Sequence, residues 1–187
     1  MIITGNSKEE IQTLKSFLAK EFEIKDLGSM KYFLGMEVAR LKVGICINQR
    51  KYILNLLKET GMTECKPADT PMDYTTKLGF IEESLPVDKE RYQWLVGKLI
   101  YLSHTRPDNA FPVSTVSQFM NRPNEEHMGA VLRILRYLKM TLGQGICFKK
   151  SKDRDVRIFT DADWAGLVVD MRSTSGYCTY VWGNLVT

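Results

Sequence analysis

The sequence predicts an α+β fold, and two kinds of periodicity predict it. Apolar residues recur at helical spacing in five segments, which indicates amphipathic helices that cover a common core. In other, shorter segments apolar and polar residues alternate and the runs stop near glycine, which is typical of antiparallel strands joined by tight turns. A chain of 187 residues with 44% hydrophobic residues is long enough to bury such a core in one or two domains.

The beginning of the chain is expected to form one amphipathic helix. Ser7 and Glu10 have the spacing of a capping box, so the helix begins near Lys8 and continues to Phe22. Its apolar positions fall on one face, namely Ile11, Leu14, Leu18 and Phe22. The residues before it, 1–4, are apolar and predict a short strand-like stub.

A β-hairpin and a second helix are expected next. After a turn at Gly28, the β-rich runs 31–41 and 44–48 are joined tightly enough to predict an antiparallel pair. The helix that follows stops at Gly61, where a C-cap glycine belongs. Its apolar face carries Tyr52, Ile53, Leu56 and Leu57.

The segment 66–87 is expected to be a linker, because it carries three prolines and no sustained period. This divides the chain into a first part, 1–65, and two later parts, 88–143 and 144–187. We therefore expect a domain boundary near the prolines, between residues 66 and 86.

Three helices are expected between Asp88 and Gly143. Proline separates them at Pro107 and Pro123, since proline cannot continue a helix. Asn124 is a suitable N-cap for the third, with two glutamates in its first turn. The apolar positions are Tyr92, Leu95, Val96, Leu99, Leu102, Val113, Val116, Met120, Met128, Val131, Leu132, Leu135 and Leu138.

The third of these helices also carries a basic strip, Arg133, Arg136 and Lys139. Cations at this spacing can follow a phosphate backbone. A solvated helix face has the same composition, so both interpretations stay open. The net charge of +4 and the pI near 8.8 fit a nucleic-acid partner and fit enzymes of small anions equally well.

From Gly145 onward, apolar residues recur at every second position, the spacing of a strand. The runs 145–150, 156–163 and 176–182 predict an antiparallel strand meander, and a Gly-Asn turn leads into a last run at 185–187.

Two aspartates, Asp161 and Asp163, stand at the end of the second run. If 156–160 is a central strand, both emerge on the same side, about 7 Å apart along the strand. Such a carboxylate could hold magnesium in a two-metal phosphodiester centre, which needs three or four acids around ions roughly 4 Å apart. The structural alternative is that Asp163 caps a turn and Asp161 pairs with Arg157 or Arg172 on the surface.

Neither the cysteines nor the hydropathy indicates a metal site, an export route or a membrane. The cysteines are far apart and form no CxxC pair, so we expect them to be reduced and mostly buried. They are Cys46, Cys65, Cys147 and Cys178. No apolar run approaches the roughly 20 residues of a membrane helix, and the first residues lack the pattern of a signal peptide. We expect an intracellular chain with no membrane partner.

Several of these segments resemble one family. FTDADWAG followed by DMRSTSGYC resembles the start of the ribonuclease H domain in copia-type retrotransposon polyproteins, which encode reverse transcriptase and ribonuclease H in that order. KDLGSMKYFLGMEV resembles the primer-grip hairpin of these reverse transcriptases. RYQWLVGKLIYLSHTRPD resembles the opening of their thumb, and ILRYLKMT resembles a later thumb helix. The resemblance covers essentially the whole chain, with the motifs in the family's order.

The resemblance implies what each part of the α+β fold is. Residues 1–65 would form a palm-edge β-hairpin with flanking helices, and 88–143 a helical thumb. Residues 144–187 would form an incomplete ribonuclease H-like antiparallel meander.

It also implies site residues. Asp161 matches the first metal-binding aspartate of the ribonuclease H domain, which makes it the catalytic and metal candidate. The primer-grip turn, which would lie against the primer end, is matched by Leu34, Gly35 and Met36. The thumb helix that tracks the duplex is matched by Gly97 and Lys98, and weaker phosphate candidates are Arg133, Arg136 and Lys139. For each the structural alternative stays open, such as a glycine that only satisfies its turn.

The family's other catalytic acids, an early aspartate, a tyrosine-led aspartate pair and the later acids of ribonuclease H, are expected outside these residues. We therefore expect a fragment of an RNA-directed DNA polymerase and ribonuclease H polyprotein that is catalytically incomplete. Mg²⁺ would serve the intact protein and bind weakly here. The expected partners are an RNA/DNA hybrid or primer–template duplex and the rest of the Pol polyprotein. The alternatives are a non-specific nucleic-acid-binding module and a non-functional relic.

Overall fold

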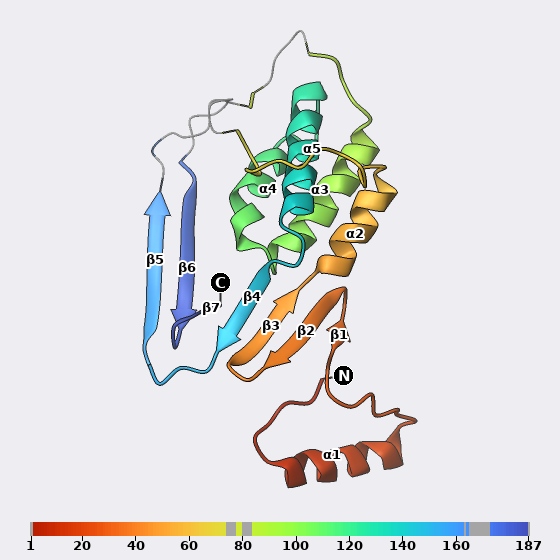
Figure 1. The fold of residues 1–187 in the computed structure, drawn as a ribbon, viewed down its shortest axis with the longest axis vertical. Helices are drawn as coiled ribbons and strands as arrows, with labels where there is room; N and C mark the ends of the chain where they lie inside the picture. Colours follow the sequence, from red (N-terminus) through yellow and green to blue (C-terminus); the bar gives the residue numbers. More distant parts are fainter. Residues whose placement is uncertain (1, 74–77, 80–83, 163, 165–172, 187) are drawn as a thin grey trace. The chain divides into compact units, whose positions relative to one another are not determined.

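The computed structural model describes residues 2–73, 78–79, 84–162, 164 and 173–186 (Figure 1). Five α-helices and two antiparallel sheets lie in this part of the chain, so the expected mixed α+β class is confirmed. The chain divides into two compact units, Met1–Met30 and Lys31–Thr187. None of the helices described is both long enough and apolar enough to span a bilayer. The domain limits at 66–87 and 144 stay predictions.

The first unit contains helix α1, Lys8–Glu21, as predicted. The Ser7 side chain accepts a hydrogen bond from the Glu10 amide at 3.3 Å, which is the capping contact that the sequence indicated. The strand-like stub expected at 1–4 is wrong for residues 2–4, which are not in a strand. A strand needs a neighbour for its amide and carbonyl groups, and no strand among the described residues pairs with this stretch.

The first sheet of the second unit has the order β1-β2-β3-β4, and every pair is antiparallel. Its strands are β1 Tyr32–Phe33, β2 Met36–Leu41, β3 Gly44–Asn48 and β4 Gly145–Lys149. The hairpin of β2 and β3 is the predicted one. The expected single run 31–41 is wrong, because the chain turns back at Leu34 and Gly35 and Phe33 pairs with Met36.

Both residues of this turn have positive φ, 46° at Leu34 and 80° at Gly35. Two positive φ values in a two-residue loop are the mark of a type I′ hairpin turn, whose twist matches that of the strands. The first position usually holds asparagine, aspartate or glycine, because the Cβ of other residues is crowded there. Leu34 is 68% exposed, so burial in the core does not explain why a leucine occupies it.

Strand β4 belongs to this sheet and not to the tail meander in which the sequence predicted it. It pairs with β3 along its whole length, from Gly44 opposite Lys149 to Asn48 opposite Gly145. Glycines permit the approach, since a Cβ on Gly145 would lie 2.1 Å from the Ile47 carbonyl oxygen. The chain therefore returns, after its helices, to the sheet that it left.

The second sheet has the order β5-β6-β7, and its strands are β5 Val156–Ala162, β6 Ser175–Val181 and β7 Asn184–Leu185. The period-two pattern of the tail is confirmed for these three strands. Strand β5 lies at the edge and every residue in it is exposed, so the conditional expectation of a central strand at 156–160 does not hold.

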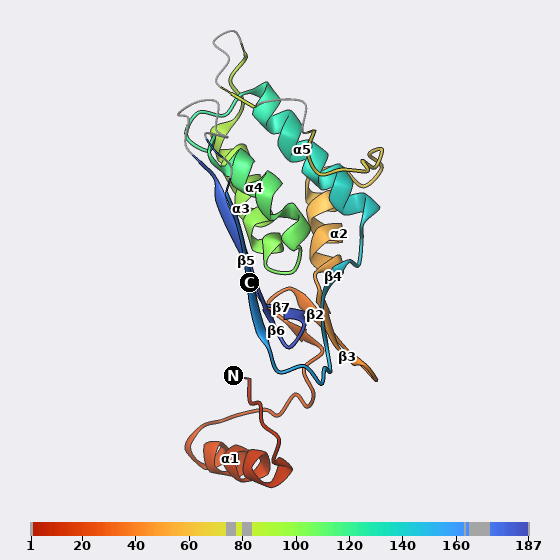
Figure 2. The same cartoon turned by 90° about the vertical axis from the view of Figure 1, so that its left-hand side faces the viewer.

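The helices of the second unit form its core (Figure 2). They are α2 Arg50–Glu59, α3 Lys89–Ser103, α4 Ala110–Ser117 and α5 Glu125–Met140, with the 3-10 turn η1 Pro107–Asn109 before α4. All four were predicted, and Asn124 caps α5 by accepting from the His127 amide at 3.0 Å. The buried core consists of Ile53, Leu56, Leu57, Tyr92, Leu95, Val96, Leu99, Leu102, Val113, Val116, Phe119, Val131, Ile134, Leu135 and Leu138.

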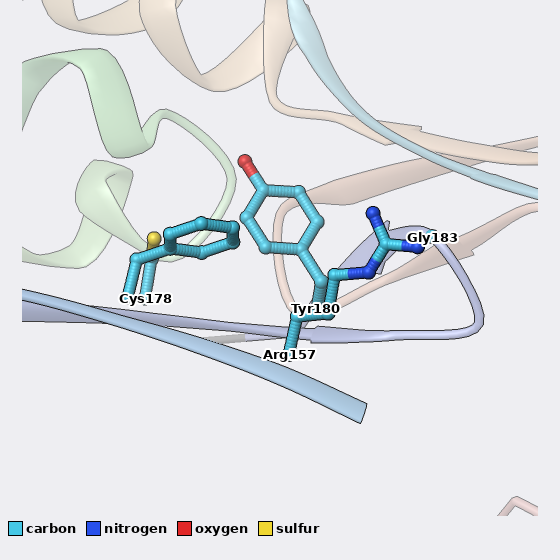
Figure 3. A pocket seen from close by; sticks show the side chains of 5 residues that line it. Arg157, Cys178, Tyr180 and Gly183 are labelled. Atoms are coloured by element: carbon cyan, nitrogen blue, oxygen red, sulfur yellow. The ribbon is translucent and has the colours of Figure 1, made fainter. Parts of the chain in front are cut away.

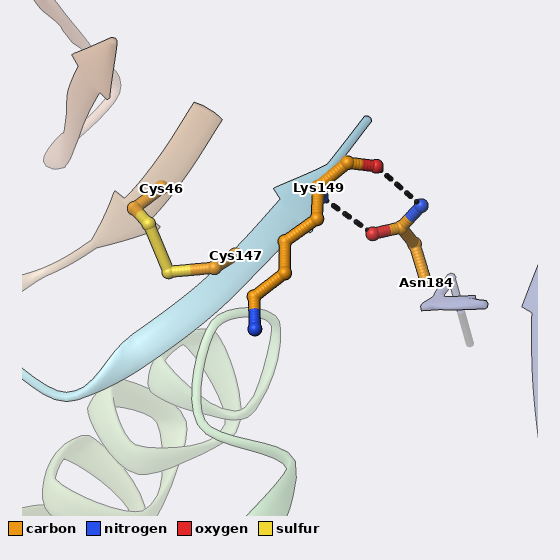
Figure 4. The surroundings of a disulfide bond; sticks show 4 residues. All are labelled: Cys46, Cys147, Lys149 and Asn184. Atoms are coloured by element: carbon orange, nitrogen blue, oxygen red, sulfur yellow. Dashed lines mark hydrogen bonds between the residues drawn. A yellow bond between two sulfur atoms is a disulfide. The ribbon is translucent and has the colours of Figure 1, made fainter. Parts of the chain in front are cut away.

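The expectation of reduced cysteines is wrong for Cys46 and Cys147, which form a disulfide between β3 and β4 (Figure 4), and holds for Cys65 and Cys178. The register places them directly opposite each other, with their Cα atoms 4.0 Å apart, although 101 residues separate them in sequence. Cys65 and Cys178 are free and partly exposed. Strand β7 is linked to β4 by Asn184, whose side-chain amide accepts a hydrogen bond from the Lys149 N–H and donates one to the Lys149 carbonyl (Figure 4).

Candidate nucleic-acid interface

The turn between β1 and β2 is seated against helices α2 and α3. The hydroxyl of Tyr101, on α3, donates a hydrogen bond to the carbonyl oxygen of Leu34. A Cβ on Gly35 would lie 3.4 Å from Tyr52 Cδ2 and 3.6 Å from Tyr101 Cε1, so the two rings cover the glycine closely. The rings also contact each other, with centroids 5.4 Å apart.

Lys98 lies one helical turn before Tyr101 and has Tyr52 as a common aromatic neighbour. Its Nζ is 5.5 Å from the ring centroid of Tyr52 and 5.3 Å from that of Trp94. Glu59 is a loose ion-pair partner at 3.9 Å, in a geometry that contributes little at a surface. The two rings attract the ammonium, while the Lys98 side chain remains 33% exposed.

We call Leu34, Gly35, Tyr52, Lys98 and Tyr101 the turn cluster. It combines an exposed apolar side chain with a positioned cation. Backbone phosphates attract such a cation, and sugars or base edges offer surface to an apolar side chain. The arrangement can therefore contact a nucleic-acid backbone without reading its sequence.

The predicted site residues are brought together only in part. Gly97 and Lys98 lie on α3, and Tyr101 of the same helix donates a hydrogen bond to the Leu34 carbonyl. Met36 begins β2 directly after the turn. The exposed face of Gly97 has nothing within 4 Å of a Cβ built on it, so a ligand could approach the helix backbone there.

The basic strip on α5 is engaged by the chain itself. Arg133 donates to the Thr70 hydroxyl at 2.9 Å, and Lys139 donates to the Cys65 carbonyl at 2.8 Å. The Arg136 carbonyl accepts from the Ala68 amide at 3.3 Å. These bonds hold the start of the expected linker along α5. A phosphate role for the three basic residues stays a prediction.

Asp161 lies on the exposed edge strand β5, and its carboxylate accepts from the Ala162 amide at 3.0 Å. Arg157 forms its ion pair with Asp155, two residues earlier, and not with Asp161 as one alternative expected. Asp163 and Arg172 lie outside the described residues, so the rest of that interpretation is not tested. Within the described ranges, no three acidic, histidine or cysteine side chains gather as metal ligands would.

An open pocket of about 470 Å³ lies on one face of the β5–β6 pair (Figure 3). Its lining residues are Arg157, Phe159, Cys178, Tyr180 and Gly183. The facing positions alternate along paired strands, Arg157 opposite Tyr180 and Phe159 opposite Cys178. The pocket therefore lies over one face of the sheet, and Arg157 is the charged side chain that lines it.

Sequence reasoning missed the ion pair between the buried Arg106 and the exposed Asp108, just after α3. The Arg106 side chain is 1% exposed and donates to both carboxylate oxygens of Asp108, at 2.9 and 2.6 Å. It also donates to the carbonyl and hydroxyl of Thr141, at 3.2 and 2.7 Å. The sequence RPD resembles an exposed turn, and the contact with Thr141, far along the chain, leaves no sign in it that the Arg106 side chain is buried. The tyrosine contact to Leu34 was missed too, since Tyr101 lies outside the apolar stripe.

Comparison with known proteins gives a consistent set of similarities. Residues 1–74 match the family described as "Reverse transcriptase (RNA-dependent DNA polymerase)". The chain is 41% identical, over 97% of its length, to the retrovirus-related Pol polyprotein from transposon RE1 of Arabidopsis thaliana, and it spans 12% of that protein. It is 39% identical over 95% of its length to the Pol polyprotein from transposon TNT 1-94 of Nicotiana tabacum, of which it spans 14%.

An uncharacterized mitochondrial protein of Arabidopsis thaliana is similar over the whole chain, with 34% identity and 78% of that protein covered. No solved structure gives a significant match.

Proposed function

The chain belongs to the reverse transcriptase region of the copia-type retrotransposon Pol polyproteins, and from this premise we propose that its turn cluster holds the duplex of primer and template. One observation supports the proposal most directly. Leu34, exposed and in a left-handed turn, is hydrogen-bonded to the helix that also carries Lys98. A crowded backbone conformation that burial does not explain is characteristic of residues that contact a ligand.

Each part of the turn cluster has a distinct task in this proposal. Lys98 neutralises a phosphate, and its two aromatic neighbours limit the freedom that the side chain would lose on binding. Leu34 lies against sugars or base edges near the primer end. Neither contact distinguishes one base from another, as a polymerase that moves along its template requires.

We further propose that the isolated chain binds nucleic acid without cutting or extending it. Reverse transcriptases generally use Mg²⁺, which when bound neutralises charge at the reacting phosphate. The described residues do not fit such an ion, because Asp161 stands on an exposed edge strand and, within the described ranges, no three acidic, histidine or cysteine side chains gather into a ligand set. Magnesium-dependent cleavage of the RNA strand of a hybrid by the pure chain would contradict this part.

The salt dependence of binding tests the proposal. The dissociation constant of the 187-residue chain for a short RNA/DNA hybrid is measured between about 50 and 200 mM salt. We expect a steep loss of affinity, and a slope of log K against log salt that is smaller by about 0.9 in Lys98→Gln. The matched control is Lys152→Gln, an exposed lysine between β4 and β5, which should keep the wild-type slope. A flat salt profile of the wild type would overturn the proposal.

A further inference from the structure

The contact between Tyr101 and Leu34 joins two elements that are 67 residues apart in sequence. Leu34 belongs to the turn that begins the sheet, and Tyr101 belongs to the second half of α3. The donor is a phenol and the acceptor is a main-chain carbonyl, so the bond acts on the backbone of the turn. It therefore bears on the conformation of Leu34 itself.

The Tyr101 ring is held by its neighbours, which fixes the direction of its hydroxyl. The Tyr52 ring is tilted against it at 5.4 Å, and the His104 ring lies at 5.8 Å. His104 is held in turn, since its Nδ1 is 3.0 Å from the Tyr101 carbonyl oxygen. A side chain supported in this way loses little further freedom when it makes its hydrogen bond.

We propose that Tyr101 is a positioning residue: it holds Leu34 in the left-handed conformation and so fixes the distance between Leu34 and Lys98, the two contacts to the duplex. The inference rests on the proposed function. Left-handed backbone is unfavourable for a residue with a Cβ, so without a partner the turn would sample other conformations. The hydroxyl bond to the carbonyl selects the conformation in which the apolar side chain and the ammonium act together.

This role has a signature that distinguishes it from a phosphate contact. Loss of the hydroxyl removes no charge, so the number of phosphates neutralised, and with it the salt slope, stays the same. The affinity falls because the duplex must then select the correct turn conformation from several. Loss of Lys98, in contrast, changes the slope.

The test uses two variants of the same chemistry on the same helix. Tyr101→Phe removes the bond to Leu34, and Tyr92→Phe removes a buried bond of 2.7 Å to the Val116 carbonyl in the core. The dissociation constant for an RNA/DNA hybrid and its salt slope are measured for both variants and for the wild type. The carbonyl ¹³C shift of Leu34 is followed in the free proteins.

We expect Tyr101→Phe to bind about five-fold more weakly, the size of one net hydrogen bond, with an unchanged slope and a moved Leu34 carbonyl shift. Tyr92→Phe should lose stability and keep the wild-type affinity and shift. Wild-type affinity in Tyr101→Phe would overturn the inference, while the reduced slope of Lys98→Gln would leave the proposed function standing. If the wild type binds no hybrid, the proposed function fails. Independently of binding, an unchanged ¹³C shift of the Leu34 carbonyl in Tyr101→Phe would show that Tyr101 does not hold the turn.

Discussion

The guanidinium of Arg106 and the carboxylate of Asp108 form a two-point ion pair in which one partner is buried and the other is not. Arg106 is 1% exposed, whereas the Asp108 side chain is 36% exposed. The arginine also binds Thr141, at the end of α5, and lies 5.6 Å from the ring centroid of Tyr137. The pair therefore fastens the end of α3 to the end of α5.

The exposure of the two partners predicts unequal effects of their removal. Asp108→Ala leaves a buried guanidinium without its anion, so we expect a loss of about 3–5 kcal/mol in the free energy of unfolding. Arg106→Met removes the buried charge itself, and water can solvate the remaining Asp108, so its loss should be smaller. Urea unfolding measures both. A larger loss in Arg106→Met than in Asp108→Ala would contradict this interpretation.

The stability of the chain should fall below about pH 6.5 because of His127. Burial lowers the pKa of His127, against the opposing effect of the hydrogen bond to the Gly79 carbonyl. Nδ1 accepts from the Asn124 amide at 3.1 Å, and a protonated ring would lose that bond. Because the pKa of His127 is lower in the folded chain, the unfolded chain binds the proton more readily. The contribution of neutral His127 to the free energy of unfolding is therefore complete above the pKa of the unfolded chain and is lost on acidification.

His127→Gln is the matched variant, because glutamine can close the same capping box and does not titrate. Urea unfolding between about pH 7.5 and 5 should show a steeper decline for the wild type than for His127→Gln. Parallel curves would contradict the assignment.

The turn itself predicts opposite effects at its two positions. Leu34→Asn should raise stability by about 0.5–1 kcal/mol, because asparagine tolerates positive φ and Asn-Gly suits a type I′ turn. Gly35→Ala should lower it by about 1–2 kcal/mol, since φ is 80° and the new Cβ meets the Tyr52 ring. Thermal unfolding checks both variants, and equal effects of one sign would contradict the turn geometry.

Leu34→Asn also separates stability from function. The variant should bind an RNA/DNA hybrid more weakly than the wild type although it folds more stably. Contact with the duplex is the reason we propose for a leucine at this unfavourable backbone position. Unchanged binding of the hybrid by Leu34→Asn would therefore contradict that contact.

Reduction of the disulfide should destabilise the second unit. Cys46 and Cys147 close a loop with a sequence separation of 101, and a disulfide typically adds about 2–4 kcal/mol to the free energy of unfolding by constraining the unfolded chain. Reductant should therefore lower the urea midpoint of the wild type and leave Cys46→Ser/Cys147→Ser unchanged. Cys65→Ser, which removes a free thiol, should respond to reductant as the wild type does. Four alkylatable thiols in the untreated folded chain would refute the pairing.

The helices could be predicted from the sequence because their signals are local. Apolar spacing marked α3 and α5, and Asn124 marked the start of α5 within its own first turn. The sheet could be predicted only where its strands are neighbours in the chain, as in β2 and β3. The pairing of β3 with β4 depends on where the intervening helices return the chain, and the disulfide follows from that register.

The candidate site, like the sheet, could be predicted only in part. The resemblance indicated Leu34, Gly35 and Lys98, but not that Tyr52 and Tyr101 contact them. Arg133 and Lys139 looked like a free basic strip because their carbonyl and hydroxyl partners lie in the segment at 65–70, which has no period of its own. Contacts of this kind depend on tertiary packing and leave no local pattern.

The most direct test of the central claim is to map where a duplex touches the folded chain. A short RNA/DNA hybrid is titrated into the isotope-labelled protein, and amide shifts are followed by NMR. The proposed function predicts the largest changes at Leu34, Gly35 and Lys98. Changes confined to the Arg133–Lys139 face of α5, or to the pocket of β5 and β6, would contradict it.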